Sequence, residues 1–274
     1  MARVLILSSY VASSRVGGGA QALALARLGI EPILIPTVLF GRHPGHGPPG
    51  GGAVNAATFE AMIGGVEAQG LFAHLDAVIT GYFSSPEQVA VAADALGRVR
   101  AAAPSARLIV DPIMGDEAKG LYVKDAVAEA IATLLVARAD IVAPNAWELG
   151  RLTGSEVSDP ASGVAAARRL GKPVVVSSIR AGGAIGVVYA ADGDAWFASH
   201  PATTAAPNGT GDLLTALFAA ASLGQFPPAA ALELAVSGVA EAVVLAGGMD
   251  ELPIAALPVM LVASPRVRLA PLHG

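Results

Sequence analysis

Residues 207–214 read Pro-Asn-Gly-Thr-Gly-Asp-Leu-Leu, a turn containing Gly209 and Gly211 that leads directly into a long apolar helical pattern. Two glycines let the backbone turn sharply and point several N–H groups outward at the start of a helix, which is the geometry that binds phosphate oxygens. Asp212 would repel an anion held there, unless its carboxylate faces a substrate hydroxyl and accepts the proton. The stretch therefore suggests an anion site with a catalytic base beside it. The simpler alternative, an acidic residue favoured at a helix N-terminus, is the commoner explanation on spacing alone.

Upstream of this turn, short β-branched runs alternate with longer alanine-rich segments. The runs are typical of strands buried on both faces, and they lie at residues 4–7, 32–38, 77–80, 108–110, 141–142 and 174–176. Helix-length apolar periodicity fills the gaps, at residues 21–28, 56–69, 86–102, 125–137 and 160–170. Residues 184–190 and 195–199 flank an Asp-Gly-Asp turn and predict a hairpin, and residues 209–223 and 228–246 predict two closing helices. This order predicts a three-layer α/β/α fold, with a mostly parallel central sheet and helices on both faces.

The chain is predicted to form a single domain over residues 1–274, because α/β layer folds of this size often form one unit and no linker or repeat interrupts it. Residues 41–52 hold six Gly, three Pro and two His, so they are predicted to be a loop without strand or helix. A flexible connector and a lid over a site are equally compatible with this composition. The Pro-rich tail from Leu252 is expected to pack loosely at the surface.

The amino-acid composition limits the classes of binding partner and the cell compartment that can be expected. Apolar residues make up 54% of the chain, charged residues only 14%, and the net charge is −5, which supplies a large core but no basic field for nucleic acid or anionic lipid. The absence of cysteine excludes disulfides and thiolate chemistry and suits a reducing compartment. The apolar run at residues 4–7 is too short for a signal peptide, and Glu233 and Glu241 interrupt the most apolar region. We expect a cytoplasmic protein that binds neither nucleic acid nor membrane.

Three other site motifs are present only in part. Residues 17–22 fit the dinucleotide-binding pattern G-x-G-x-x-A, but the first glycine comes ten residues after the predicted strand and Glu31 arrives too early for a ribose contact. The Gly-Lys pair at residues 171–172 is followed by proline and lacks the upstream glycine of a phosphate-binding P-loop. His43 and His46 have a spacing compatible with a metal, although polar loop residues are the simpler explanation.

The Gly-Thr-Gly-Asp turn before an apolar helix resembles the signature of ribokinase-like sugar and vitamin kinases. Other segments resemble the pyridoxal kinase branch of that superfamily: Asp-Pro-Ile-Met-Gly-Asp at 111–116, Ala-Asp-Ile-Val-Ala-Pro-Asn at 139–145 followed by Glu148, Thr-Gly-Tyr at 80–82, Thr-Val-Leu-Phe at 37–40 followed by His43, and Ser-Ser at 177–178. Six matches in order on one βα framework are far more specific than any single motif. The resemblance runs from Val4 to about residue 246.

This resemblance implies an ATP-dependent kinase that phosphorylates the 5′-hydroxymethyl group of pyridoxal or a related B6 vitamer, giving pyridoxal 5′-phosphate in vitamin B6 salvage. Asp212 would deprotonate the hydroxymethyl group, and backbone N–H groups of Gly209, Thr210 and Gly211 would form the anion hole. The resemblance places ATP binding at Asp111, Asn145, Glu148, Ser177 and Ser178. It places Mg²⁺, held directly or through water, at Asp111, Asp116 and Glu148. A K⁺ ion and a homodimer are implied by the family alone.

By the same resemblance, the acceptor ring would lie among Ser9, Val16, Val38, Phe40, His43 and Tyr82. A hydroxyl and an imidazole can hydrogen-bond a pyridine nitrogen or phenolic oxygen, while branched and aromatic side chains cover the ring. The chain departs from the family pattern nearby, with residues 8–11 replacing a longer Ser-x-Gln-Ser-His-Val, Pro44 replacing a threonine and His46 replacing a tyrosine. These departures leave the preferred vitamer open.

Three alternative functions compete with pyridoxal kinase. Hydroxymethylpyrimidine kinase is the nearest, because its substrate is also a flat heterocycle that carries a CH₂OH group. A non-catalytic vitamin-binding protein would not need the glycines and the acid at 209–212. An NAD-dependent oxidoreductase rests only on the partial motif at 17–22.

Overall fold

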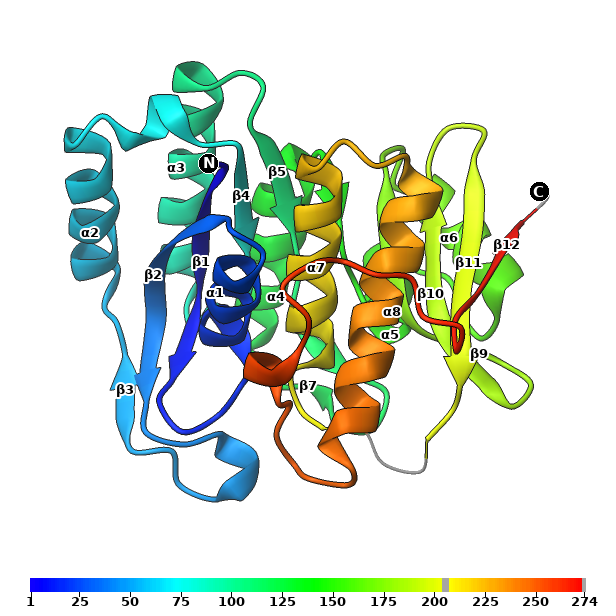
Figure 1. Cartoon of the computed structure of the whole chain (residues 1–274). Helices are drawn as coiled ribbons and strands as arrows, with labels where there is room; N and C mark the ends of the chain where they lie inside the picture. Colours follow the sequence, from blue (N-terminus) through cyan, green and yellow to red (C-terminus); the bar gives the residue numbers. More distant parts are fainter. Residues whose placement is uncertain (204–206, 273–274) are drawn as a thin grey trace.

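A ten-stranded sheet forms the middle layer of the molecule (Figure 1). The computed structural model describes residues 1–203 and 207–272. From one edge to the other, the strands are β12 (Arg268–Pro271), β11 (Ala195–Pro201), β10 (Ala184–Ala190), β9 (Val174–Ala181), β8 (Ile141–Val142), β5 (Arg107–Val110), β4 (Ala77–Thr80), β1 (Arg3–Val11), β2 (Glu31–Phe40) and β3 (Gly51–Ala53). The strands from β9 to β2 run parallel, and antiparallel strands extend both edges. The prediction of a mostly parallel sheet is confirmed.

The sequence of β1 shows why the sheet is covered on both faces. Residues 4–7 are inaccessible to solvent, and because successive strand side chains point to opposite faces, they enter two different cores. Val4 and Ile6 join the core beneath α1 (Gly17–Arg27), α7 (Thr210–Leu223) and α8 (Pro228–Ala246). Leu5 and Leu7 join the core beneath α2 (Ala56–Ala68), α3 (Pro86–Ala102) and α4 (Asp125–Ala130). The three-layer α/β/α arrangement is therefore confirmed.

Two short elements near the sheet were not predicted. Helix α5 (Ala146–Thr153) has only eight residues, too few to show helical periodicity in the sequence. Asn145 and Glu148 form a capping box at its start, and Gly154 ends it in the left-handed conformation. The two-stranded hairpin of β6 (Gly115–Asp116) and β7 (Gly120–Leu121) is too short to show a pattern. Both elements lie beside the carboxyl end of the sheet. Helix α6 (Pro160–Arg169) follows and packs, with α5, over β9 and β10 in a third core.

The prediction for residues 41–52 is wrong in part. His43 caps the 3-10 turn Pro44–His46 by accepting a hydrogen bond from the Gly45 amide at 3.1 Å. Strand β3 pairs antiparallel with the end of β2, so the segment is the tip of a β-ribbon. Gly51 has a φ of +86°, and a Cβ there would lie 2.0 Å from the carbonyl oxygen of Leu39, so this close return requires glycine.

The C-terminal tail does not pack loosely, as the sequence had suggested. Leu252, Ile254 and Leu257 are buried in the core beneath α1, α7 and α8, and β12 pairs with β11. Proline content indicates irregular backbone, but it does not decide whether apolar side chains between the prolines are buried.

Helix α8 is long and apolar enough to cross a membrane by length and composition, which contradicts the expectation from Glu233 and Glu241. Core helices of soluble proteins pass the same test. In the structure, 44% of its most apolar window is buried, and the helix packs on α7, β10 and β11.

The parallel strands all direct their carboxyl ends to one end of the molecule, the lower end in Figure 1. The start of α7 and the ribbon tip at residues 41–50 lie at the same end. Segments far apart in sequence therefore meet there, as expected for a site in a parallel α/β sheet.

Candidate active site

A cavity of about 520 Å³ opens at the carboxyl ends of the parallel strands. It is lined by every residue predicted to act in catalysis, the anion hole, ATP binding or metal binding: Asp111, Asp116, Asn145, Glu148, Ser177, Ser178, Gly209, Thr210, Gly211 and Asp212. These residues come from the segment after β5 that runs into β6, from the start of α5, from β9 and from the start of α7. The fold therefore assembles in one place what the sequence holds in four separate segments.

Asp212 lies in the first turn of α7 but does not act as an ordinary helix cap. The α7 N-terminus has no side-chain capping bond, and Gly209 at the N-cap has a φ of +88°. The Oδ1 atom of Asp212 is enclosed and has no hydrogen-bond partner, while the backbone amide of Gly17 in α1 bonds the carboxylate. Burial raises the pKa of Asp212 to about 6, against the opposing effect of the Gly17 bond. An unpartnered carboxylate oxygen on a residue that lines a cavity is suited to accept a proton.

Asp111 is buried directly after β5, in the middle of the sheet. Its Oδ2 accepts a hydrogen bond from the Thr215 hydroxyl of α7 at 2.8 Å, which ties the base-bearing helix to the sheet. Burial raises the pKa of Asp111 well above its usual value, and the charges of Glu148 and Asp212 raise it further. Asp111 is therefore a buried carboxylate under the negative charge of two others.

Glu148 and Asn145 hold the β6–β7 hairpin against α5. One carboxylate oxygen of Glu148 accepts the amides of Met114 at 2.6 Å and Gly115 at 3.3 Å, and the other accepts the Asn145 amide at 2.9 Å. The Asn145 side chain in turn donates to the Gly115 carbonyl at 2.8 Å. Burial raises the pKa of Glu148 to about 7, and these backbone bonds oppose the rise. Both side chains are therefore engaged in shaping the cavity wall.

The predicted metal ligands line the cavity without forming a cage. Asp116 accepts the Lys119 amide at 2.7 Å, Asp111 holds Thr215, and Glu148 holds three amides. Among the described residues, no group of three or more His, Cys, Asp or Glu side chains is placed to hold a metal ion. Carboxylate oxygens still suit Mg²⁺, which usually keeps several waters and takes only one or two protein carboxylates beside a substrate phosphate. The donor set fits an ion bound in that manner.

Strained backbone marks two further positions in the cavity wall. Ile113 has a φ of 39° and Ser178 a φ of 63°, values that side chains with a Cβ rarely adopt. Both residues line the cavity, and Ser178 is itself one of the predicted nucleotide residues. Such strain is typical of functional sites, where the surrounding structure holds the backbone in an unfavourable conformation.

The six predicted acceptor residues do not line this cavity. They lie on the neighbouring strands and loops: Ser9, Val38 and Phe40 in β1 and β2, Val16 at the N-cap of α1, His43 at the cap of the 3-10 turn, and Tyr82 after β4. Ser9 and Val16 are joined to the base through Gly17, because a Cβ on Gly17 would lie 1.9 Å from the Ser9 hydroxyl and the Gly17 amide bonds Asp212. Ser9 and Val16 are therefore the predicted acceptor residues that the structure connects to Asp212.

Burial shifts the pKa values of two of these acceptor residues, His43 and Tyr82, and neighbouring charges also shift that of His43. Burial lowers the pKa of His43, as do the charges of Lys119 and His46, so its imidazole is biased toward the neutral form that can accept a hydrogen bond. Burial raises the pKa of Tyr82, which keeps its phenol protonated. The Tyr82 carbonyl accepts the Thr37 hydroxyl at 2.7 Å, which fixes this loop to β2.

Sequence reasoning missed three residues of the site. Thr215, one turn after Asp212 in α7, holds Asp111. Tyr122 lines the cavity, and its pKa is raised by burial and by the charges of Glu148, Asp116, Asp111 and Asp212. Gly17 belongs to the glycine run that partly matched a dinucleotide motif, and the structure shows instead that it lets α1 approach β1 closely. Thr215 could have been found from the sequence, because residues three positions apart on a helix lie on the same face and Asp212 was already a candidate.

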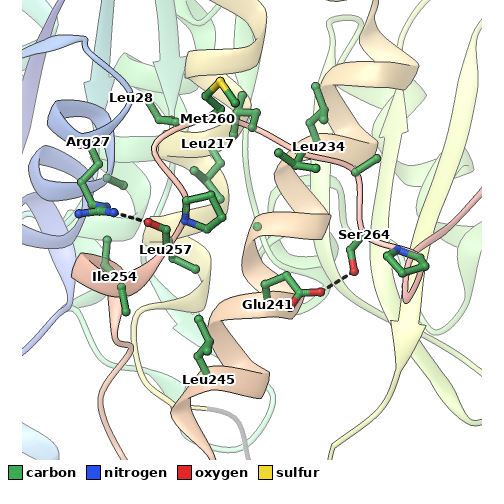
Figure 2. Close-up of a pocket in the computed structure, with 18 residues that line it drawn as sticks. Arg27, Leu28, Leu217, Leu234, Glu241, Leu245, Ile254, Leu257, Met260 and Ser264 are labelled. Carbon is green, nitrogen blue, oxygen red and sulfur yellow. Dashed lines mark hydrogen bonds between the residues drawn. The ribbon is translucent and has the colours of Figure 1, made fainter.

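A second cavity, of about 410 Å³, lies away from this site between α1, α7, α8 and the C-terminal tail (Figure 2). No predicted site residue lines it. Arg27 donates to the Leu257 carbonyl, and Ser264 donates to Glu241 at 2.5 Å, so polar bonds at both sides fasten the tail across the helices (Figure 2). This cavity reflects how the tail crosses the helix layer.

Comparison with known proteins identifies the family of this chain. The family model described as phosphomethylpyrimidine kinase matches residues 65–254. The chain is 37% identical over 233 residues to a pyridoxine/pyridoxal/pyridoxamine kinase of Bordetella avium, covering 80% of this chain and 79% of that one. It is 35% identical over 277 residues to a pyridoxal kinase of Rubrobacter xylanophilus, covering 96% and 94%.

A solved structure extends the likeness over the whole chain. The pyridoxal kinase of Leishmania donovani in complex with ADP and pyridoxamine superposes with a TM-score of 0.91 at 25% identity, covering 100% of both chains. The match to curated relatives above 30% identity confirms the resemblance drawn from the motifs. The chain belongs to the phosphomethylpyrimidine kinase family and is a member of its pyridoxal kinases.

Proposed function

We propose that this enzyme transfers the γ-phosphoryl group of ATP to the 5′-hydroxymethyl oxygen of pyridoxal or a related B6 vitamer. Relatives above 30% identity are named as kinases of these vitamers, and a structural relative is described in complex with ADP and pyridoxamine. The observation that carries the proposal is the enclosed, unpartnered Oδ1 of Asp212 beside the glycine turn, in a cavity lined by the predicted nucleotide residues.

The chemistry follows from the placement of these groups. The acceptor oxygen forms a bond to the γ-phosphorus, the bond from that phosphorus to the bridging oxygen of ADP breaks, and the hydroxyl proton passes to Asp212. The N-terminal amides of α7 at Gly209, Thr210 and Gly211 stabilise charge on the phosphoryl oxygens. Asn145, Ser177 and Ser178 line the cavity on the nucleotide side.

Mg²⁺ is the ion that the carboxylates of this cavity fit. Asp111 and Asp116 would hold it together with water and triphosphate oxygens, and Glu148 would support the hairpin that carries Asp116. Bound there, the ion would neutralise charge on the phosphate groups. The mutual repulsion that raises the pKa of Asp111 would fall when the cation is present.

The acceptor would lie against Ser9, Val16, Val38, Phe40, His43 and Tyr82, next to the base. Because Nδ1 of His43 accepts the Gly45 amide, the neutral imidazole can donate a hydrogen bond from Nε2 to a phenolic oxygen, and the ribbon tip at 41–52 would cover the ring as a lid. A single catalytic domain over 1–274, a cytoplasmic location without membrane association, a homodimer and a K⁺ requirement stay predictions.

A substrate panel tests the function. Purified enzyme with Mg-ATP is given pyridoxal, pyridoxine, pyridoxamine and hydroxymethylpyrimidine, and ADP release and the phosphorylated product are both measured. We expect the highest kcat/KM with a B6 vitamer. Turnover of the pyrimidine alone would favour the second candidate, hydroxymethylpyrimidine kinase, which the matching family model supports. Absence of any phosphorylated product would reject both.

A further inference from the structure

Glu251, three residues into the segment that follows Gly248, joins parts of the chain that are distant in sequence. Its Oε2 accepts a hydrogen bond from the backbone amide of Arg15 at 2.6 Å, and its Oε1 lies 3.9 Å from Nε2 of His46 in the ribbon tip. Its backbone forms a parallel bridge with Asn208, the residue before the glycine turn. The segment reaches these partners because, after α8, it crosses the carboxyl end of the molecule toward α1 (Figure 1).

The loop that Glu251 holds is in contact with the catalytic turn. A Cβ on Gly209 would lie 2.2 Å from the carbonyl oxygen of Arg15, so the loop backbone packs directly against the anion hole. Two residues further along, the Gly17 amide bonds the Asp212 carboxylate. A displacement of the loop at Arg15 would therefore reach both the phosphate-binding turn and the base.

We propose that Glu251 is a positioning residue that locks the loop Arg15–Gly17 against the turn Asn208–Asp212 and so fixes the base for phosphoryl transfer. Its carboxylate accepts the Arg15 amide on one side, while its backbone pairs with Asn208 on the other. A short hydrogen bond from an amide to a carboxylate is among the stronger kinds in proteins. The contact with His46, at 3.9 Å, is much looser and serves the ribbon tip rather than the base.

Three substitutions separate these contacts. Glu251→Ala removes the acceptor for Arg15 and the charge near His46, Glu251→Gln keeps an acceptor oxygen without the charge, and His46→Ala removes only the loose pair. Asp250→Asn is the matched control, because the side chain of this neighbouring acid is exposed and its carbonyl remains available to Asn208.

We expect Glu251→Ala to lower kcat with the preferred B6 vitamer about ten-fold, the effect of losing one charge-assisted hydrogen bond, with KM for ATP unchanged within about two-fold. Glu251→Gln should restore most of kcat, and Asp250→Asn should stay within about two-fold of the wild type. His46→Ala is read only by hydrogen exchange, where the Arg15 amide should stay protected. Near-normal kcat in Glu251→Ala would overturn the proposal. So would an equal loss in Glu251→Gln, or loss of Arg15 amide protection in His46→Ala.

The pH dependence of kcat distinguishes a displaced Asp212 from a general loss of structure, because a general loss of structure would not shift its acid limb. Displacing the Gly17 amide removes a bond that favours ionised Asp212, so the acid limb of kcat should move to higher pH in Glu251→Ala. The other groups that face Asp212 are Asp111 and Tyr122, and the substitution leaves both in place. An unchanged acid limb together with lower kcat would indicate a merely structural role and would also overturn the proposal.

Hydrogen exchange at the Arg15 amide tests its contact with Glu251 without a measurement of turnover. The catalytic part of the inference rests on the proposed function. In the wild-type enzyme the Arg15 amide should exchange at least about ten-fold more slowly than an unprotected amide. Protection should be lost in Glu251→Ala and kept in Glu251→Gln. If the wild type phosphorylates no vitamer, the proposed function fails, while exchange of the Arg15 amide still tests the contact with Glu251. If Glu251→Ala does not fold, free exchange of the Arg15 amide in the wild type would refute the positioning role of Glu251.

Discussion

Replacing Asp212 with asparagine should inactivate the enzyme and stabilise its fold at the same time. The side chain keeps its size, but an amide cannot accept the hydroxyl proton, so we expect kcat to fall by a factor of about 100 to 10,000. The pKa of Asp212 lies at about 6 rather than at the usual 3.8, chiefly because of burial. The fold therefore holds a charge that would be more stable in water.

The stability gain can be worked out from this pKa. An acid whose pKa is raised by folding destabilises the fold at every pH above the folded value, and this penalty disappears as the pH falls through 6 to 3.8. One pKa unit corresponds to about 1.4 kcal/mol, so the ionised form costs about 3 kcal/mol at pH 8, an upper value because the residue is partly exposed. We expect Asp212→Asn to raise the free energy of unfolding by about 1 to 3 kcal/mol at pH 8 and by little at pH 4.

Urea unfolding at both pH values and initial rates with Mg-ATP measure the two effects on the same protein. Asp192→Asn is the control, because Asp192 is exposed in the hairpin turn and should change neither quantity. The reasoning would be refuted by Asp212→Asn retaining kcat within about three-fold of the wild type. Lower stability of this variant at pH 8 would show that the carboxylate is held by bonds stronger than the cost of its burial.

Three further predictions follow from the same site. Since the base must be ionised, kcat should decline as the pH falls below about 6, the pKa of Asp212, in a pH–rate profile from pH 5 to 9. Thr215→Val should lower the free energy of unfolding by about 1 to 3 kcal/mol in denaturant titrations, because it removes the donor to buried Asp111, and Thr215→Ser should restore it. Gly209→Ala should lower both kcat and melting temperature, because the φ of Gly209 is +88° and the new Cβ would lie 2.2 Å from a carbonyl oxygen. Gly211→Ala should leave the melting temperature nearly unchanged, because a Cβ at this position would have no atom within 4 Å.

The strands and most helices could be predicted because their signals are local. Residues 4–7 and 77–80 are apolar because the sheet is covered on both faces, and periodicity within one segment is enough to show it. Helix α5, the hairpin at 115–121 and β3 were missed because they are shorter than the windows in which a period can be seen. The burial of Leu252 and Ile254 was missed because it depends on contacts with α1 and α7, which are distant in sequence.

The residues predicted for catalysis, the anion hole, ATP and metal line one cavity, and their roles stay predictions. The sequence did not show that polar atoms of Glu148 and Asn145 bond the backbone at residues 114 and 115. It also did not show that the predicted acceptor residues lie outside the lining of this cavity. Which atom bonds which partner depends on distances between segments, and those are absent from any local pattern.

The order of residues along this chain was sufficient to identify a layered α/β kinase and to single out Asp212 as the candidate base, because periodicity, glycine turns and motif order are properties of neighbouring residues. Only the folded chain decided that one oxygen of this carboxylate has no partner, that Gly17 bonds the carboxylate, and that Glu251 holds the intervening loop. The physical reason is that burial and hydrogen bonding depend on proximity in space, and Glu251 reaches Arg15 across 236 residues of sequence.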